Sequence, residues 1–461
     1  MDYDASKPRG FSGKIGLARR DITPPIGIYS RCWGAANFDC ATAIHHPFTV
    51  TAQVVEAEDD LGPFVLMAFD GFVWSDPNDE WLCREAVIKH LKTAVSRVII
   101  SISHTHAGVQ LTRDNKDKPG GEYIEPYIQT LKNEFVAAAQ EAKENCREAN
   151  LDWLVSHCDL ATNRDFKDPQ DERFVVGFNP DKKTDDTVLI GRVSDSAGEL
   201  FAVIVNYACH PTTLAWENTQ LSPDYVAALR LTVENQYPDA LCMFLIGACG
   251  DLAPAQQYVG DVAVADRHGR RLAYAVLQGL ESLPPAQKLF LREIKESGAP
   301  LAVWDSEAVC FPRNTQALKC AAPIKIKDEW LDIAAIEQEL EACSDRVLQE
   351  RLLRKLRVRK SLENAEDFTL DTWVWRLGEM IIVGSSAEHY SYLQVTLRQE
   401  FPELPILVLN LINGANGYLP EKELYEHNIY SVWQTPFAQG GLESMKATML
   451  EKINILLLET M

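Results

Sequence analysis

Two histidines in the stretch Ser103-His104-Thr105-His106-Ala107-Gly108 are the first residues whose type and spacing could do chemistry. They follow residues 98–102, an apolar run that is typical of a buried strand. On a strand, residues i and i+2 point to the same face, so His104 and His106 could bind one ion or stand side by side in one pocket. The alternative is a polar turn after a buried strand, in which each histidine is only hydrogen-bonded.

Three further polar residues, His210, Glu388 and Tyr418, come shortly after other apolar runs. Two imidazoles, a carboxylate and a phenolate around an open position would suit a catalytic zinc ion, which needs about three or four protein ligands and leaves room for water. The residues have no local signature of the His-Glu-x-x-His kind. Their types alone therefore leave both a metal site and ordinary structural roles open.

The elements that must position these residues are strands alternating with helices. Strands are predicted at residues 48–55, 64–69, 98–102, 154–160, 187–193, 200–207, 240–246, 372–383 and 406–412, and helices at 78–94, 123–145 and 266–277. This order predicts an α/β fold, a layered sandwich of mixed β-sheets flanked by helices. Residues 328–361 are rich in Glu, Leu and Arg and predict a helical hairpin inserted on the outside of the fold, while residues 167–186 predict a surface loop.

Composition limits the classes of partner. The chain has 461 residues, 46% of them hydrophobic, and a net charge of −21, which disfavours nucleic acid or an anionic membrane as the main partner. It has no apolar stretch of transmembrane length, and its N-terminus lacks the basic-then-apolar order of a signal peptide, so we expect a cytoplasmic protein. Eleven scattered cysteines without Cys-x-x-Cys spacing predict free thiols, several of them buried. The oligomeric state is left open.

Several short motifs, taken together, resemble the landmarks of the neutral ceramidase family in the same order. Besides residues 103–108, they are Asp21-Ile22-Thr23-Pro24, residues 45–55, Asn163-Arg164, Ala208-Cys209-His210, Ser222-Pro223-Asp224-Tyr225, Gly250-Asp251-Leu252-Ala253-Pro254, Ala387-Glu388 and residues 418–430. The resemblance spans about residues 13 to 440. Each motif is short, but their common order is specific.

The resemblance implies a zinc enzyme that hydrolyses the amide bond of an N-acylated sphingoid base. Carried over by position, the zinc ligands would be His104, His210, Glu388 and Tyr418. His106 would stand beside the metal as acid or base, Arg164 would face the substrate, and Tyr430 would be a second hydrogen-bonding phenol. It also implies one catalytic domain over residues 1–461 that contains the insertion at 328–361.

Three departures from the family pattern make ceramide itself doubtful as the substrate, and one is that the chain, ending at Met461, leaves no room for the C-terminal immunoglobulin-like domain of the full-length ceramidases. Ala253 stands where many members have Ser, and Ser386-Ala387-Glu388-His389 replaces Gly-Glu-Phe. The first hypothesis is thus a zinc-dependent hydrolase that cleaves the amide bond of a small or N-acylated substrate. The alternatives are a zinc-dependent ester or lactone hydrolase or lyase acting on a small metabolite, and a noncatalytic binding protein. Asp224 and Asp251 either orient the ligand histidines or cap the helices that follow them.

Overall fold

The computed structural model describes residues 7–282, 284–330, 332–362 and 368–458. Its larger sheet has eight strands in the order β15, β13, β12, β8, β1, β3, β4, β6. Their bounds are β1 (Gly10–Asp21), β3 (Thr49–Val55), β4 (Phe64–Phe69), β6 (Val98–Ile102), β8 (Arg147–His157), β12 (Thr187–Asp195), β13 (Leu200–Tyr207) and β15 (Leu241–Ile246). The edge pairs β13–β15 and β4–β6 are parallel and the pairs between them antiparallel, so the sheet is mixed.

A second, four-stranded sheet packs face to face against the first. It consists, in order, of β19 (Thr315–Pro323), β20 (Thr369–Leu377), β21 (Met380–Ser385) and β23 (Ile406–Leu409). Apolar side chains of both sheets form one buried cluster between them, in which Leu151 and Leu245 of the larger sheet join Trp375 of the smaller. Trp375 also donates its indole N–H to the backbone oxygen of Ser96 at 2.6 Å. The indole of Trp375 is therefore buried in the core between the sheets with its N–H group hydrogen-bonded.

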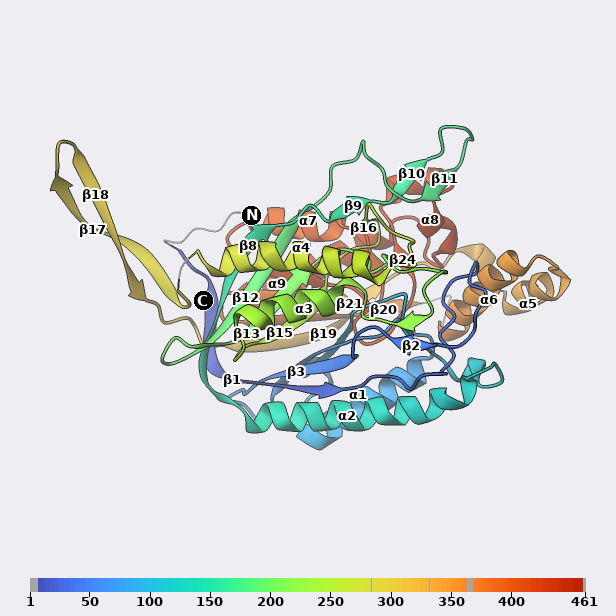
Figure 1. The fold of residues 1–461 in the computed structure, drawn as a ribbon, viewed down its shortest axis with the longest axis horizontal. Coiled ribbons are helices and arrows are strands. Elements are labelled where there is room, and N and C mark those ends of the chain that lie inside the picture. Colours follow the sequence, from blue (N-terminus) through green and yellow to red (C-terminus); the bar gives the residue numbers. More distant parts are fainter. Residues whose placement is uncertain (1–6, 283, 331, 363–367, 459–461) are drawn as a thin grey trace.

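Helices cover the two outer faces (Figure 1). Those against the larger sheet are α1 (Pro77–Leu91), α2 (Ile124–Glu144), α3 (Tyr225–Gln236) and α4 (Val262–Leu280). Those against the smaller sheet are α7 (Tyr392–Glu400) and α9 (Gly441–Leu458). The four layers, helix, sheet, sheet and helix, confirm the predicted α/β sandwich.

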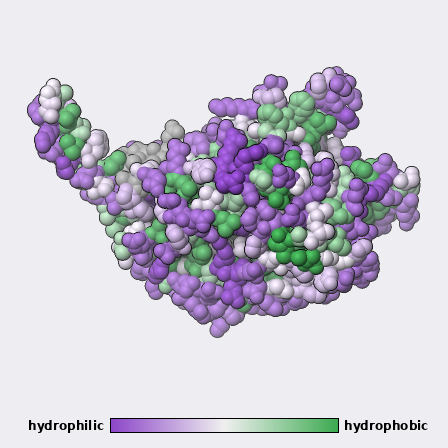
Figure 2. Space-filling model, viewed as in Figure 1, coloured by the Kyte–Doolittle hydropathy of each residue, from purple (hydrophilic) through white to green (hydrophobic). Residues whose placement is uncertain are grey.

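Two regions differ from the predicted elements. The apolar run at 372–383 is a hairpin of β20 and β21 that turns at Gly378 and Glu379, because both strands are buried and only a two-residue turn separates them. A second hairpin, β17 (Gln287–Glu296) with β18 (Pro300–Ala308), was not predicted and projects from the body of the protein (Figure 1). Its exposed apolar side chains, among them Ile294 and Trp304, alternate with charged ones (Figure 2).

All eleven cysteines are free, and Cys209, Cys242 and Cys249 are buried, as expected. Across the ranges that the structure describes, every helix is too short or too polar to cross a membrane.

The larger sheet curves so that its two edge strands, β15 and β6, come into contact. Asn413, in the loop after β23, ties this region to the smaller sheet: its amide oxygen accepts from Ile100 N at 2.8 Å and its amide nitrogen donates to Val98 O at 3.0 Å. Because of this curvature, segments that follow opposite edges of one sheet lie near each other.

Residues 328–361 contain α5 (Ile333–Ala342) and α6 (Arg346–Ser361), which pack against each other. Most residues of α5 are exposed on the outside of the fold, whereas α6 lies beside the loops that follow the strands, next to α8 (Tyr430–Gln434) (Figure 1).

Candidate metal centre and substrate cavity

His104 lies two residues beyond the end of β6, in a left-handed backbone conformation with φ of 65°. Such a conformation costs a residue with a side chain on the order of 1–3 kcal/mol and is concentrated at functional sites. The Nδ1 of His104 is 2.7 Å from the backbone oxygen of Phe72, which can only accept, so Nδ1 carries the proton. The other ring nitrogen, Nε2, is buried and has no hydrogen-bond partner within the described residues.

His210 follows β13 and is oriented in the same way. Its Nδ1 donates to the backbone oxygen of Cys249 at 2.6 Å, which turns Nε2 toward Glu388. The Nε2 atoms of His210 and His104 lie 3.1 and 3.4 Å from the same oxygen, Oε2 of Glu388. A backbone oxygen that fixes the tautomer of a histidine is the usual support of a metal ligand.

Glu388 belongs to the short strand β22 (Glu388–His389), which pairs in parallel with β24 (Tyr418–Leu419). The register places Tyr418 directly beside Glu388, so the last two predicted ligands are neighbours on adjacent strands. The phenol of Tyr418 is buried, and the guanidinium of Arg164 lies 5.4 Å from the centre of its ring.

The electrostatics of the cluster suit a bound cation. Burial would raise the pKa of Glu388, but the imidazoles of His104 and His210 hold it well below its usual value, so this group is a carboxylate. Burial, with Arg164 nearby, lowers the pKa of His210 to about 4, so this imidazole is neutral at pH 7. Burial and the adjacent Glu388 raise the pKa of Tyr418 well above its usual value, a direction that a cation in contact with the phenol would oppose.

His106 stands beside the other two histidines with its ring centre 4.9 Å from that of His104 and 6.1 Å from that of His210. One nitrogen of each of the three rings lies within 4.8 Å of one nitrogen of each of the others, so the three imidazoles could share an ion. His106 lacks the backbone acceptor that the other two have: its Nδ1 is 3.6 Å from the sulfur of Cys32, and its Nε2 has no hydrogen-bond partner in the described chain. Burial, then the neighbouring imidazoles, lower the pKa of His106, which is therefore neutral.

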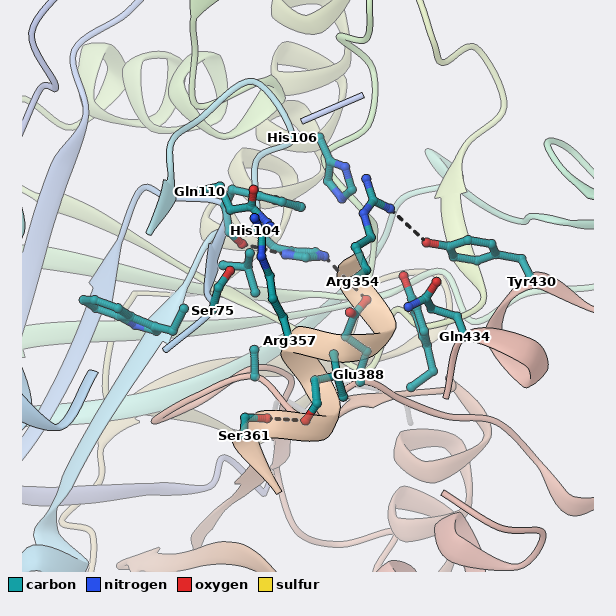
Figure 3. A pocket seen from close by; sticks show the side chains of 17 residues that line it. Ser75, His104, His106, Gln110, Arg354, Arg357, Ser361, Glu388, Tyr430 and Gln434 are labelled. Atoms are coloured by element: carbon teal, nitrogen blue, oxygen red, sulfur yellow. Dashed lines mark hydrogen bonds and ion pairs between the residues drawn. The ribbon is translucent and has the colours of Figure 1, made fainter. Parts of the chain in front are cut away.

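A cavity of about 110 Å³ opens onto this cluster (Figure 3). His104, His106, Glu388, Tyr418 and Tyr430 line it. A second cavity of about 200 Å³ shares His106, Tyr418 and Tyr430 with the first and adds Arg164. The structure therefore gathers the predicted site residues around two adjoining cavities, with His210 buried behind them.

Arg164 is held by the loop after β15. Its Nε and Nη2 both donate to the backbone oxygen of Gly250, at 3.1 and 2.7 Å. A Cβ on Gly250 would lie 2.9 Å from the backbone oxygens of Glu388 and His389, so the close approach of this loop to β22 requires glycine.

The carboxylates of Asp224 and Asp251 accept hydrogen bonds from backbone N–H groups and do not hydrogen-bond to a histidine of the site. Asp224 accepts from the backbone nitrogen of Tyr225 at the start of α3, and burial raises its pKa to about 6. Asp251 accepts from the backbone nitrogen and the hydroxyl of Ser391, just before α7, at 2.7 and 2.8 Å. Ala253, in β16 (Leu252–Pro254), is fully buried and lines neither cavity.

The sequence missed the contribution of α6 to the first cavity. Four of its residues, Arg354, Arg357, Val358 and Ser361, line this cavity. Their spacing of i, i+3, i+4 and i+7 places them on one face of the helix, which is the only signal in the sequence. The helix carries several other basic residues, so nothing in their type marked these two arginines.

The sandwich has the fold of solved neutral ceramidase structures, as the sequence motifs led us to expect. A solved structure described as a ceramidase complexed with C2 is similar over 95% of this chain and 74% of that chain, with a TM-score of 0.66 and 15% identity. The neutral ceramidase from Pseudomonas aeruginosa is similar over 95% of this chain and 73% of that chain, with a TM-score of 0.64 and 16% identity. No protein-family model and no curated protein sequence matches the chain. At this level of identity the likeness shows a shared fold.

Proposed function

We propose that the protein is a zinc-dependent hydrolase that cleaves an amide (N-acyl) bond with water. The observation that carries the proposal is the convergence of two buried Nε2 atoms, from His104 and His210, on the carboxylate of Glu388, with each Nδ1 held by a backbone oxygen. In this proposal residues 1–461 act as one catalytic unit that contains the insertion at 328–361. The substrate is a small or N-acylated molecule.

The donor set fits zinc. His104, His210, Glu388 and Tyr418 would hold the ion, and imidazole nitrogen with carboxylate oxygen is a common ligand set of catalytic zinc sites. When bound there, zinc would polarise the carbonyl group of the substrate and lower the pKa of a water molecule toward neutrality. The unpartnered Nε2 of His104 is the feature that the ion would satisfy, since buried polar atoms are rarely left without a partner.

The residues of the chain would move the protons. Water adds its oxygen to the carbonyl carbon, and the neutral imidazole of His106 takes the proton that is released. The C–N bond then breaks, and His106 returns the proton to the leaving nitrogen, so one amide and one water give one carboxylic acid and one amine. Tyr430, which lines both cavities, is placed to donate a hydrogen bond to the carbonyl oxygen as its negative charge develops. Arg164, in the second cavity, would contact the part of the substrate farther from the scissile bond.

Metal analysis of purified protein tests the site. We expect about one zinc per chain in the wild type and in His157→Ala, because His157 is an exposed histidine outside the cluster. His104→Ala and His210→Ala should each lose the ion, and full metal content in both variants would overturn the assignment. His106→Ala should keep the zinc and lose turnover, and loss of zinc in this variant would make His106 a ligand.

Matched substrates test the reaction. We expect the zinc-loaded wild type to hydrolyse N-butyryl-4-nitroaniline as well as 4-nitrophenyl butyrate, with both activities lost in His106→Ala. Cleavage of the ester alone would favour the ester or lactone hydrolase. Zinc content without turnover on a broad panel of amides and esters would favour a binding protein.

A further inference from the structure

The face of α6 that lines the first cavity brings two arginine side chains to it. Arg354 extends from the helix toward His106 and Tyr430, and Arg357 reaches toward Gln110 (Figure 3). Val358 and Ser361 complete the same face. This helix of the predicted insertion is therefore a wall of the candidate substrate site.

The guanidinium of Arg354 is only weakly compensated. Its Nη2 donates to the backbone oxygen of Cys32 at 2.8 Å, and its Nη1 lies 3.5 Å from the phenol oxygen of Tyr430. In the described parts of the chain it makes no ion pair with a carboxylate, and Glu350, one turn earlier on α6 and in the same second cavity, lies 3.7 Å from Arg31 instead. A cation shielded from water without a counter-charge is costly, and arginine presents a fork of N–H donors that matches a carboxylate or phosphate.

Arg357 is compensated little better. Its Nη2 donates to the side-chain oxygen of Asn115 at 3.1 Å, and its Nε lies 3.7 Å from a carboxylate oxygen of Asp114, whose side chain is 69% exposed. An ion pair of that length with an exposed partner contributes little. Both guanidinium groups thus retain the capacity to bind another anion.

The cavity itself is positively charged. Glu388 is the one carboxylate among the described residues that line it, and Glu388 already faces His104 and His210. A zinc ion would add to the positive charge. The chain has a net charge of −21, yet two arginines gather at this one small cavity. The cavity is therefore suited to bind a negatively charged group of a ligand.

The cavity also limits the size of the group beside the cluster. Its volume is about 110 Å³, and Phe72, Trp74 and Val358 form apolar parts of its wall. An apolar cavity of about 150 Å³ holds a benzene molecule, so this one has room for a short apolar group.

From these observations we infer that Arg354 and Arg357 form an anion subsite, and that the substrate is a small amide bearing a carboxylate or a phosphate next to a short acyl group. That the substrate is an amide rests on the proposed function, whereas that it carries an anionic group rests on the two arginines alone. It makes α6, the insertion, the element that sets substrate class.

Equilibrium binding tests the subsite separately from turnover. The probes are N-butyrylglycine, N-butyryl-phosphoethanolamine and the neutral N-butyrylglycinamide, titrated calorimetrically into zinc-loaded and chelator-treated full-length protein. We expect at least one anionic probe to bind about 10-fold or more tightly than the neutral one, since hydrogen bonds to charged groups are worth more than neutral ones. The stronger of the two anionic probes identifies the anion.

Variants assign the preference to α6. Arg354→Gln and Arg357→Gln should each reduce the preference for the anionic over the neutral probe several-fold, and the double variant should abolish this preference. Arg354→Lys should keep part of it. The matched control is Lys360→Gln, which removes one charge from an exposed position on the same helix, where Lys360 pairs with Glu337. Circular dichroism confirms that each variant is folded, and Arg354→Lys with Arg357→Gln decides the matter if Arg354→Gln does not fold.

Two results would overturn the inference: equal or undetectable binding of all three probes by the wild type at millimolar concentration, or an equal loss of preference in Lys360→Gln. An arginine-dependent preference that persists in chelator-treated protein excludes zinc as the anion-binding group and supports the subsite. The same preference without amide hydrolysis would leave the anion subsite standing and refute the hydrolase.

Discussion

The buried carboxylate of Asp251 joins the loop that holds Arg164 to the segment that carries Glu388. Its Oδ1 accepts from Ser391 N at 2.7 Å, and its Oδ2 accepts from Ser391 Oγ at 2.8 Å and from Asn163 Nδ2 at 3.3 Å. The backbone oxygen of Asp251 accepts from Arg164 N at 2.9 Å. Replacement of this carboxylate should therefore loosen both sides of the site at once.

The change Asp251→Asn lets us estimate the loss. The amide oxygen can keep the bond to Ser391 N, and the amide nitrogen can donate to Ser391 Oγ, but both bonds become neutral. The amide nitrogen would also face the donor of Asn163, whose own oxygen is engaged by Asp165 N. Hydrogen bonds to charged groups contribute about 1.5–3 kcal/mol and neutral ones about 0.5–1.5 kcal/mol, so two weakened bonds and one lost bond destabilise the fold by about 4–5 kcal/mol.

Urea denaturation of metal-free protein measures this loss, and zinc titration should show a lower affinity, because Asp251 holds Ser391, three residues after the proposed ligand Glu388. The control is Asp332→Asn, at the exposed start of α5, where Asn and Asp cap a helix equally well and no change is expected. An Asp251→Asn variant within about 1 kcal/mol of wild type, with unchanged zinc affinity, would refute the reasoning.

Three further predictions concern the fold and its metal. Gly16→Ala should destabilise the protein by about 3 kcal/mol in urea denaturation, because an ideal Cβ would lie 2.0 Å from the backbone oxygen of Ala142, whereas Gly177→Ala, with open space around it, should have no effect. Burial, with two neighbouring arginines, lowers the pKa of His268 from 6.5 to about 4. The contribution of His268 to the free energy of unfolding is therefore fully present above pH 6.5. It decreases as the pH falls from 6.5 toward 4, because in this range only the unfolded state binds the proton. The part due to His268 is about 2 kcal/mol between pH 6.5 and 5 and should vanish in His268→Gln, measured by denaturation at both pH values; the same slope in both proteins would contradict it. Removal of zinc with a chelator should lower the melting temperature by several degrees and its return should restore it, since an ion that binds only the folded state stabilises it; an unchanged melting curve would count against a tight site.

The positions of the candidate site residues at the ends of strands were predictable, because these residues follow strong apolar runs. Val98 to Ile102 is buried throughout, so the polar residues after it had to lie at an edge of the sheet. The strand-based reason for pairing His104 with His106 was wrong, however. The strand ends before His104, and the two rings meet because the backbone turns through a left-handed residue. A single backbone angle of this kind depends on the surrounding structure and leaves no periodic pattern in the sequence.

Long-range packing was not predictable from periodicity. The contact between β6 and β15, which brings the loops of His104 and His210 together, depends on the curvature of eight strands. The position of α6 was missed for a related reason. Its amphipathic pattern indicates a helix with one packed face, but not whether that face meets a sheet or a cavity. The projecting hairpin of β17 and β18 escaped because its strands pack on no core that would impose a regular apolar pattern.

The hydrogen bond between Ile100 N and Asn413 Oδ1 joins residues 313 positions apart in the chain. At a synthesis rate of about 5–20 residues per second, roughly 15 to 60 seconds separate the emergence of the two from the ribosome. During that interval β6 is an edge strand with its partner from the second sheet not yet made, and the ligand set of His104 lacks both Glu388 and Tyr418. If the proposed zinc site is correct, its four ligands are all present only after Tyr418 has been made, and until then β6 remains an edge strand open to strand-to-strand association.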